Sequence, residues 1–125
     1  GIETVQVVYN RLNKKSKEKI LPISHSQNLG VIARIPLAKG FLSGNYEPGH
    51  IFNSIDNRSK YDENKTFDML KEVKQVKKEI PKGMELSQWA LCWCLKQPFI
   101  ATVIPGVKNL QQLESNAKAS EFIVT

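Results

Sequence analysis

The chain has 125 residues, the length of one domain, with 41% hydrophobic and 24% charged residues, which suits a globular core. No apolar run approaches the roughly 20 residues of a membrane span and no signal peptide opens the chain, so we expect a cytoplasmic protein with no membrane partner. The net charge is +6, but the lysines alternate with glutamates and apolar residues, so we expect no nucleic-acid partner. The start at Gly1 rather than Met indicates a processed, tagged or truncated product.

The first predicted elements are a strand and a helix. Residues 4–9 are β-branched and mostly apolar, which predicts a buried strand. Gln6 interrupts the run, either as a satisfied core amide or as a side chain that points into a ligand site. After a polar turn, a helix is predicted over residues 16–27 with Ser16 as its N-cap. Its inward-facing residues are predicted to be Ile20, Leu21, Ile23 and Ser24.

A second buried strand is predicted over residues 31–35, after Gly30 in the left-handed position that ends the helix. Arg34 is unusual in such a run and either snorkels to solvent or faces a ligand. The next loop contains Gly40 and Gly44, which permit its backbone to curl and approach a ligand.

A lid-like loop and two helices come next. Residues 47–64 are polar without a regular element, and a loop of this length is typical of a functional lid or a disordered segment. An amphipathic helix is predicted over residues 65–82. A second helix, residues 87–96 with Ser87 as its N-cap, is apolar nearly all round, so we expect it to be sandwiched in a core.

The cysteines and histidines predict no metal site. Cys92 and Cys94 lie two residues apart on the apolar helix, therefore on opposite sides, and can neither share a metal nor form a disulfide. His25 and His50 are far apart and belong to no metal or triad motif. We interpret the cysteines as buried free thiols in a reducing compartment.

Residues 100–116 predict a strand, a tight turn and a helix. A β-branched run, typical of a buried strand, is broken by a proline–glycine pair, and Asn109 with Gln112 three residues later begins a helix in capping-box form. A helix N-terminus attracts phosphate, and Lys108 adds a full charge there. Gln112 and Asn116 lie four apart on one helix face and could bond a base. The alternative is an ordinary strand–turn–helix with a surface lysine.

The predicted order is β-α-β-loop-α-α-β-α, which implies parallel strands joined by crossover helices. Three parallel strands do not complete a sheet or a barrel, and the flanking strands show no edge protection. We therefore expect a missing portion, from another chain or from an absent part of this one.

Three segments carry a resemblance to a known family: VQVVYN at 5–10, GVIARIPLAKGFLSGNY at 30–46, and the span 87–116 with SQWALCWCL and VIPGVKNLQQLESN. In order and spacing they resemble the last three βα units of the aldo-keto reductases, over essentially the whole chain. The resemblance implies an α/β fold, the C-terminal part of a (β/α)8 TIM barrel with strands six to eight. Such a barrel takes about 250 residues. Residues 1–125 would be one fragment of that barrel domain.

The family resemblance also implies a function. Aldo-keto reductases transfer hydride from NADPH, or NADH, to an aldehyde or ketone, with a tyrosine proton donor tuned by lysine and aspartate and a nearby histidine. These four residues lie in the first half of the family's barrel, so we assign no catalytic residue here. The chain would carry the cofactor-binding half of an oxidoreductase and pair with the missing N-terminal half. The alternative is a non-catalytic half-barrel that self-associates or binds nucleotide.

The resemblance implies a set of cofactor-binding residues. Gln6 matches a glutamine near the nicotinamide amide, and Arg58 matches a lid arginine. The loop that lines the nicotinamide and pyrophosphate is matched by Arg34, Ile35, Pro36, Leu37, Ala38 and Lys39. The adenosine site is matched by Gly106, Lys108, Gln112, Ser115 and Asn116.

Some positions depart from the family pattern. Arg34 stands where an aromatic residue is common, Asn45 where many members have a lysine for phosphate, and Ser115 where many have a glutamate that binds adenine. Lys108 favours NADPH over NADH, because a 2′-phosphate rewards a cation.

Overall fold

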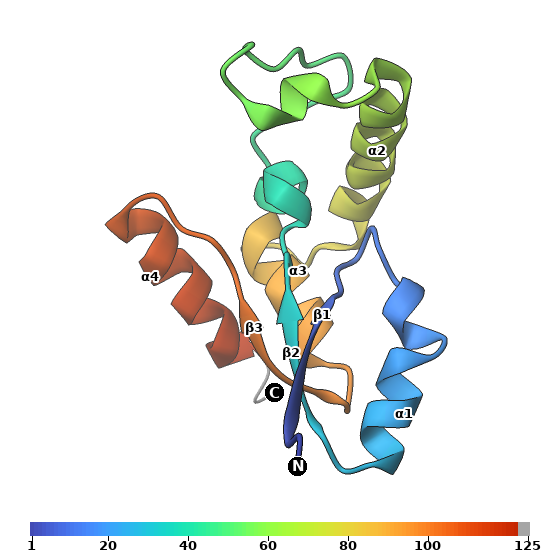
Figure 1. Cartoon of the computed structure of the whole chain (residues 1–125). Helices are drawn as coiled ribbons and strands as arrows, with labels where there is room; N and C mark the ends of the chain where they lie inside the picture. The colour runs from blue at the N-terminus through green and yellow to red at the C-terminus, as the bar shows by residue number, and fades with distance from the viewer. Residues whose placement is uncertain (123–125) are drawn as a thin grey trace.

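A computed structural model describes residues 1–122 and contains three parallel strands in the order β1-β2-β3 (Figure 1). They are β1 (Thr4–Val8), β2 (Gly30–Arg34) and β3 (Ile100–Ile104). Parallel neighbours need long crossover connections, and helices supply them here. The predicted alternation of strands and helices is confirmed.

Four α-helices and five 3₁₀ segments connect and follow the strands within residues 1–122. The helices are α1 (Ile20–Ser26), α2 (Glu63–Val76), α3 (Leu86–Leu95) and α4 (Leu110–Lys118). The 3₁₀ segments are η1 (Lys15–Lys17), η2 (Ala38–Ser43), η3 (Asn57–Lys60), η4 (Lys77–Glu79) and η5 (Ala119–Phe122). Figure 1 shows η2, α2 and the loop between them beyond the carboxyl ends of the strands.

Helices α1 and α3 pack on one face of the sheet. Leu21 of α1 and Cys94 of α3 join one buried cluster, whose other members are Tyr9, Val31, Ala33 and Ile100. A second cluster joins η2, α2 and α3, with Phe41, Leu42, Leu70, Val73 and Ala90 among its members. The second cluster matters for the site, because it fixes η2 directly above the end of β2.

The opposite face of the sheet is open. Gln6 lies level with Ile32 in the strand register, and Arg34 lies level with Ile104. Gln6 and Arg34 are exposed, and Ile104 is 46% exposed. The prediction that β1 and β3 are buried strands is therefore wrong. A strand is covered on both faces only when a second layer is present, and residues 1–122 place helices on one face.

Two predicted helix starts are also wrong. Ser16 is not an N-cap: its hydroxyl donates to the Val8 carbonyl at 3.0 Å, and α1 begins at Ile20. Helix α3 is capped by Glu85 rather than Ser87, in a capping box with Gln88. Helix α1 thus follows Lys19, whose side chain makes no cap hydrogen bond, whereas the cap of α3 lies two residues before the predicted one.

Other boundaries shift because neighbouring residues take the special backbone positions. Asn28, not Gly30, is left-handed after α1, with φ 55°. Helix α2 begins at Glu63, inside the segment expected to lack structure, and its 3₁₀ continuation ends at Glu79, before Pro81. The loop itself contains η3.

Cys92 and Cys94 are buried and free, as predicted. The Cys92 thiol donates to the Ala119 carbonyl at 3.0 Å, and the Cys94 thiol to the Tyr9 carbonyl at 3.6 Å. Burial raises the pKa of Cys94 to about 12. Both thiols thus behave as small core side chains that link α3 to its neighbours.

Helix α1 provides a direct test of which side packs inward. Leu21 is fully buried, whereas Ile23, expected to face inward, is 56% exposed. We predict that Leu21→Ala lowers the free energy of unfolding by about 2–5 kcal/mol, through lost burial and a cavity. The matched variant Ile23→Ala should change it by less than about 0.5 kcal/mol. Urea unfolding measures both, and equal losses would contradict the placement of α1.

Candidate functional site

Three loops lie at the carboxyl end of the sheet, where parallel α/β sheets bind ligands (Figure 1). The first is the segment after β2 that contains η2. The second is the loop of residues 47–62, which we call the lid. The third is the turn of residues 105–109 between β3 and α4. Their side chains form the candidate site.

The loop after β2 has a strained backbone. Ile35, Ala38 and Lys39 have φ values of 55°, 49° and 56°, in the left-handed region that non-glycine residues seldom adopt. Such residues cost about 1–3 kcal/mol each and persist where their surroundings hold them. Asn10 is one support, because its side-chain N–H donates to the Ile35 carbonyl at 2.9 Å. The end of β1 therefore shapes the loop after β2.

Arg58 fastens the lid to η2. Its guanidinium donates to the Asp56 carboxylate from Nε at 2.9 Å and from Nη2 at 2.6 Å. It also donates from Nη1 to the Lys39 carbonyl at 3.0 Å and from Nη2 to the Tyr46 hydroxyl at 3.0 Å. The guanidinium carbon lies 4.3 Å from the Phe52 ring centroid. One side chain thus joins the lid, η2 and the aromatic cluster behind them.

The charges of this group shift the pKa values of its members. Hydrogen bonds from the Arg58 side chain and backbone, with a smaller attraction from Lys108, lower the pKa of Asp56 to about 2. The hydrogen bond with Asp56 raises the pKa of Arg58. Lys108 itself lies in the turn after β3, at the same end of the sheet as η2.

Gly40 is required beside Arg58. A Cβ atom at this position would lie 2.8 Å from Nη1 of Arg58, and its φ of 89° disfavours any L side chain. The glycine predicted to allow close approach does so here for the lid arginine.

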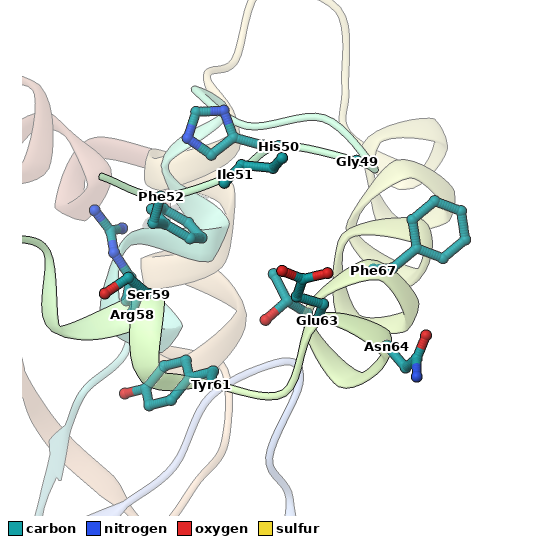
Figure 2. Close-up of a pocket in the computed structure, with 11 residues that line it drawn as sticks. Gly49, His50, Ile51, Phe52, Arg58, Ser59, Tyr61, Glu63, Asn64 and Phe67 are labelled. Carbon is teal, nitrogen blue, oxygen red and sulfur yellow. The ribbon is translucent and has the colours of Figure 1, made fainter. Parts of the chain in front are cut away.

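A cavity of about 280 Å³ lies between the lid and the start of α2 (Figure 2). Figure 2 shows Phe52 and Arg58 on the lid side and Glu63 on the α2 side. Tyr61, the last aromatic residue of the lid, also lines it. The lid is joined instead to η2. Arg58 donates to the Lys39 carbonyl, and Nζ of Lys39 donates to the Tyr61 hydroxyl at 2.5 Å.

Asn109 caps α4 as predicted, but the expected capping box is incomplete, because the Gln112 side chain bonds the residue before the N-cap. The Asn109 side chain accepts from the Gln112 backbone N–H at 2.8 Å, and the Gln112 side-chain oxygen accepts from the Lys108 backbone N–H at 2.8 Å. Both Lys108 and Gly106 are exposed. The Gln112 oxygen is therefore occupied by backbone, which leaves its amide N–H groups for a ligand.

The remaining predicted site residues lie in different surroundings. Ser115 donates to the Glu85 carboxylate at 2.6 Å and accepts from Gln88 at 3.3 Å, so it ties α4 to the start of α3. Asn116 lines an apolar groove of about 350 Å³ between α4 and β3. Gln6 and Arg34 lie on the open sheet face, with Arg34 at the site end.

Three residues in the loop after β2 are partly structural. Pro36 and Ala38 are buried, and Leu37 packs against the cluster that joins η2 to α2 and α3. Their contribution to a ligand site therefore lies mainly in the backbone.

A family model described as "Aldo/keto reductase family" matches residues 1–125. The chain belongs to the aldo/keto reductase family. The resemblance seen in the three sequence segments is confirmed. Members of this family are oxidoreductases, and the α/β fold of this chain matches that of a solved aldo-keto reductase.

A solved relative, the holo form of an aldo-keto reductase from Bacillus halodurans, has a TM-score of 0.71 and 25% identity over 97% of this chain and 38% of its own. The L-glyceraldehyde 3-phosphate reductase of Escherichia coli K12 is 33% identical over 91% of this chain and 35% of its own length. A putative voltage-gated potassium channel subunit beta of Schizosaccharomyces pombe is 33% identical over 94% of this chain and 37% of its own length. The chain thus spans less than two fifths of these relatives.

Sequence reasoning missed four residues that build the site: Asn10, Tyr46, Asp56 and Tyr61. Asn10 directly follows a strand at its carboxyl end, which was a usable signal. The opposite charges of Asp56 and Arg58, two residues apart in a loop, were a weaker signal for an ion pair. The partners of Tyr46 and Tyr61 lie 12 and 22 residues away, so no local pattern marks them.

Within residues 1–122, no helix is long and apolar enough to cross a membrane. The same residues contain no group of three or more His, Cys, Asp or Glu side chains that could hold a metal ion.

The Asp56–Arg58 pair predicts a pH dependence of the lid. Because the pKa of Asp56 in the folded chain is about 2, below its ordinary 3.8, the pair stabilises the fold fully above about pH 4. This contribution is lost as pH falls through 2. A carboxyl ¹³C NMR titration should give a midpoint near 2 for Asp56. In Arg58→Gln the midpoint should move towards 3.8, and an unchanged midpoint would contradict the pairing.

Proposed function

We propose that this chain is the C-terminal part of an NADPH-dependent aldo-keto reductase barrel, contributing strands six to eight and the cofactor-binding side. The observation that carries the proposal is that Lys39 follows β2 and Lys108 follows β3, both exposed and in no ion pair among residues 1–122. A dinucleotide cofactor carries several phosphate charges, and cations placed on separate loops suit an extended ligand of that kind. Residues 1–125 would act as one unit with residues 47–62 as its lid.

In this proposal the pyrophosphate lies against the loop of Arg34, Ile35, Pro36, Leu37, Ala38 and Lys39, under the lid. The nicotinamide extends towards Gln6 and Arg34 on the open sheet face. The adenosine lies at the α4 N-terminus, whose backbone N–H groups and partial positive charge favour a phosphate. Barrel enzymes frequently bind phosphate at the loops after strands seven and eight, which supports this arrangement.

Lys108 selects NADPH in this proposal. It lies in the turn just before the N-cap of α4 and enters no ion pair among residues 1–122. Its charge is therefore available to a 2′-phosphate, which NADH lacks. NADH is the alternative cofactor if Lys108 contacts no ligand.

When bound, the cofactor supplies a hydride for the carbonyl carbon of an aldehyde or ketone. The residues of this chain bind and orient the cofactor, and the lid excludes water from it. The proton donor would come from the portion of the barrel that precedes this chain. The name of the Escherichia coli relative supports a small aldehyde as substrate.

The partner of this chain would be the N-terminal part of the same barrel. The sheet leaves Ile104 of β3 46% exposed, and helix α4 leaves Leu110 68% and Leu113 51% exposed. Covering them would bury apolar surface and pair the edge strands. Self-association of a nucleotide-binding half-barrel is the second candidate, and it rests on the same surfaces. The buried free thiols favour a reducing compartment, and we propose the cytoplasm.

The adenosine site can be tested with 2′-phospho-AMP. Lys108→Ala should weaken its binding roughly tenfold by removing a charged hydrogen bond, and should leave 5′-AMP nearly unchanged. The matched control is Lys118→Ala, in the last turn of α4, which should alter neither affinity. Isothermal titration measures all three proteins. Equal weakening of both nucleotides would remove Lys108 from a 2′-phosphate site.

The division of the barrel can be tested by activity. The purified 125-residue chain should not consume NADPH with an aldehyde, and activity should appear when the N-terminal part is co-expressed. Turnover by the chain alone would overturn the assignment of catalysis to the other part. Sedimentation distinguishes the partners: a stable oligomer that excludes the N-terminal part would favour self-association.

A further inference from the structure

Helix α2 and its 3₁₀ continuation η4 carry their charges on two separate sides. Lys71, Lys74 and Lys78 are exposed and follow one another at the spacing of helical turns, so they share one side, and we call them the lysine row. Two glutamates lie on another side, where both accept from Arg11, at 3.5 and 3.1 Å. None of the three lysines enters an ion pair among residues 1–122. The lysine row therefore presents positive charge to solvent.

The contacts of the lysine row leave its charge in place. Nζ of Lys71 lies 5.5 Å from the centroid of the Phe67 ring, and the last lysine of the row donates to a neutral side-chain amide at 2.8 Å. Glu47 is a carboxylate close to the row, but it is bonded to Lys77. Its pKa is lowered first by that hydrogen bond, whereas Lys74 contributes only the attraction of its charge.

The lysine row starts beside the cavity between the lid and α2. Phe67 lines this cavity of about 280 Å³, and Lys71 lies one turn further on the same side of the helix. Two of the lining side chains are apolar and well exposed, Ile51 at 81% and Phe67 at 44%. Figure 2 shows Ile51 on the lid and Phe67 on α2. A cavity with apolar groups at its rim and a row of cations thus lie end to end along α2.

We propose that the cavity and the lysine row together bind an acidic peptide segment of a partner protein, which places one apolar side chain in the cavity. From Phe67 to Lys78 the helix covers about 16 Å, at about 1.5 Å per residue. An extended segment of about five residues spans the same distance. The surface therefore fits a short segment in which one large apolar residue is followed by several acidic residues.

The carboxylates around the lysine row favour a peptide over a membrane or a nucleic acid. Glu63 lines the cavity, and Figure 2 shows it on the α2 side. The glutamates bonded to Arg11 lie on the other side of the row. A flat anionic membrane or a phosphate backbone would bring negative charge close to these carboxylates, and like charges repel. A narrow peptide keeps its acidic residues over the lysines and sets an uncharged side chain beside Glu63.

This surface is separate from the one proposed for the N-terminal part of the barrel. Helix α2 packs on η2, which follows the central strand β2, whereas the outer edges of the sheet belong to β1 and β3. Figure 1 shows α2 beyond the carboxyl ends of the strands. Completing the barrel at the edges of the sheet leaves α2 available to a partner. The inference thus does not rest on cofactor binding or on catalysis.

Nuclear magnetic resonance titration of the 125-residue chain tests the inference. The probe is a peptide with capped ends, in which one phenylalanine is followed by glutamates. The parent chain should show shifts at Phe67 and along the lysine row. Replacing Lys71, Lys74 and Lys78 together by Gln should weaken binding about tenfold, because three contacts between opposite charges are lost.

The matched control removes the same charge elsewhere. Lys15, Lys17 and Lys19 are exposed lysines in and beside η1, and replacing them together by Gln should leave the affinity close to that of the parent chain. Equal weakening by the two triple replacements would show that net charge alone attracts the peptide, and it would overturn the proposed site.

The apolar contact is tested by a double-mutant cycle between chain and peptide. Phe67→Ala should weaken binding about threefold, because the cavity loses part of its apolar lining. It should have no effect on a peptide whose phenylalanine is replaced by glycine. Equal effects on both peptides would remove the cavity from the site. Circular dichroism establishes that each variant is folded.

Two further outcomes would overturn the proposal. One is that the parent chain does not bind the peptide. The other is binding to vesicles of phosphatidylserine and phosphatidylcholine that depends on the lysine row while the peptide does not bind, which would assign the surface to a lipid headgroup.

Discussion

The hydrogen bonds of the Arg58 guanidinium hold the lid against η2 at the carboxyl end of the sheet. Asp56 fixes the side chain within the lid, and the Lys39 carbonyl receives it on η2. Because Asp56 has a pKa of about 2, the pair is charged at any physiological pH. Gly40 makes the approach possible, since a larger residue would meet the guanidinium. The position of the lid beside η2 and Lys39 depends on this contact.

A second constraint acts on the whole chain, namely that three parallel strands cannot cover themselves. Helices α1 and α3 bury one face of the sheet, and the other face keeps Gln6, Arg34 and Ile104 in solvent. The open face and the site end meet at Arg34. In the proposed function, covering the open face would also complete the cofactor site, so the pairing proposal and the functional proposal depend on each other.

Local sequence signals predicted the elements better than their ends. The strands, their parallel order and the Asn109 cap followed from composition and short spacing. The starts of α1 and α3 did not, because the Ser16 hydroxyl bonds the Val8 carbonyl, and Glu85 rather than Ser87 forms the capping box of α3. Exposure of β3 was mispredicted for a related reason: an apolar run indicates what a strand can bury, not what is present to cover it.

By itself, the sequence determined the α/β class, the family and the Asn109 cap of α4, because these depend on residues close together in the chain. The tertiary structure decided which cation is free. Arg58 and Lys39 are 19 residues apart, and Lys39 and Tyr61 are 22 apart. No local pattern pairs them, and only the folded lid shows that the charge of Arg58 is neutralised by Asp56 while that of Lys39 stays available.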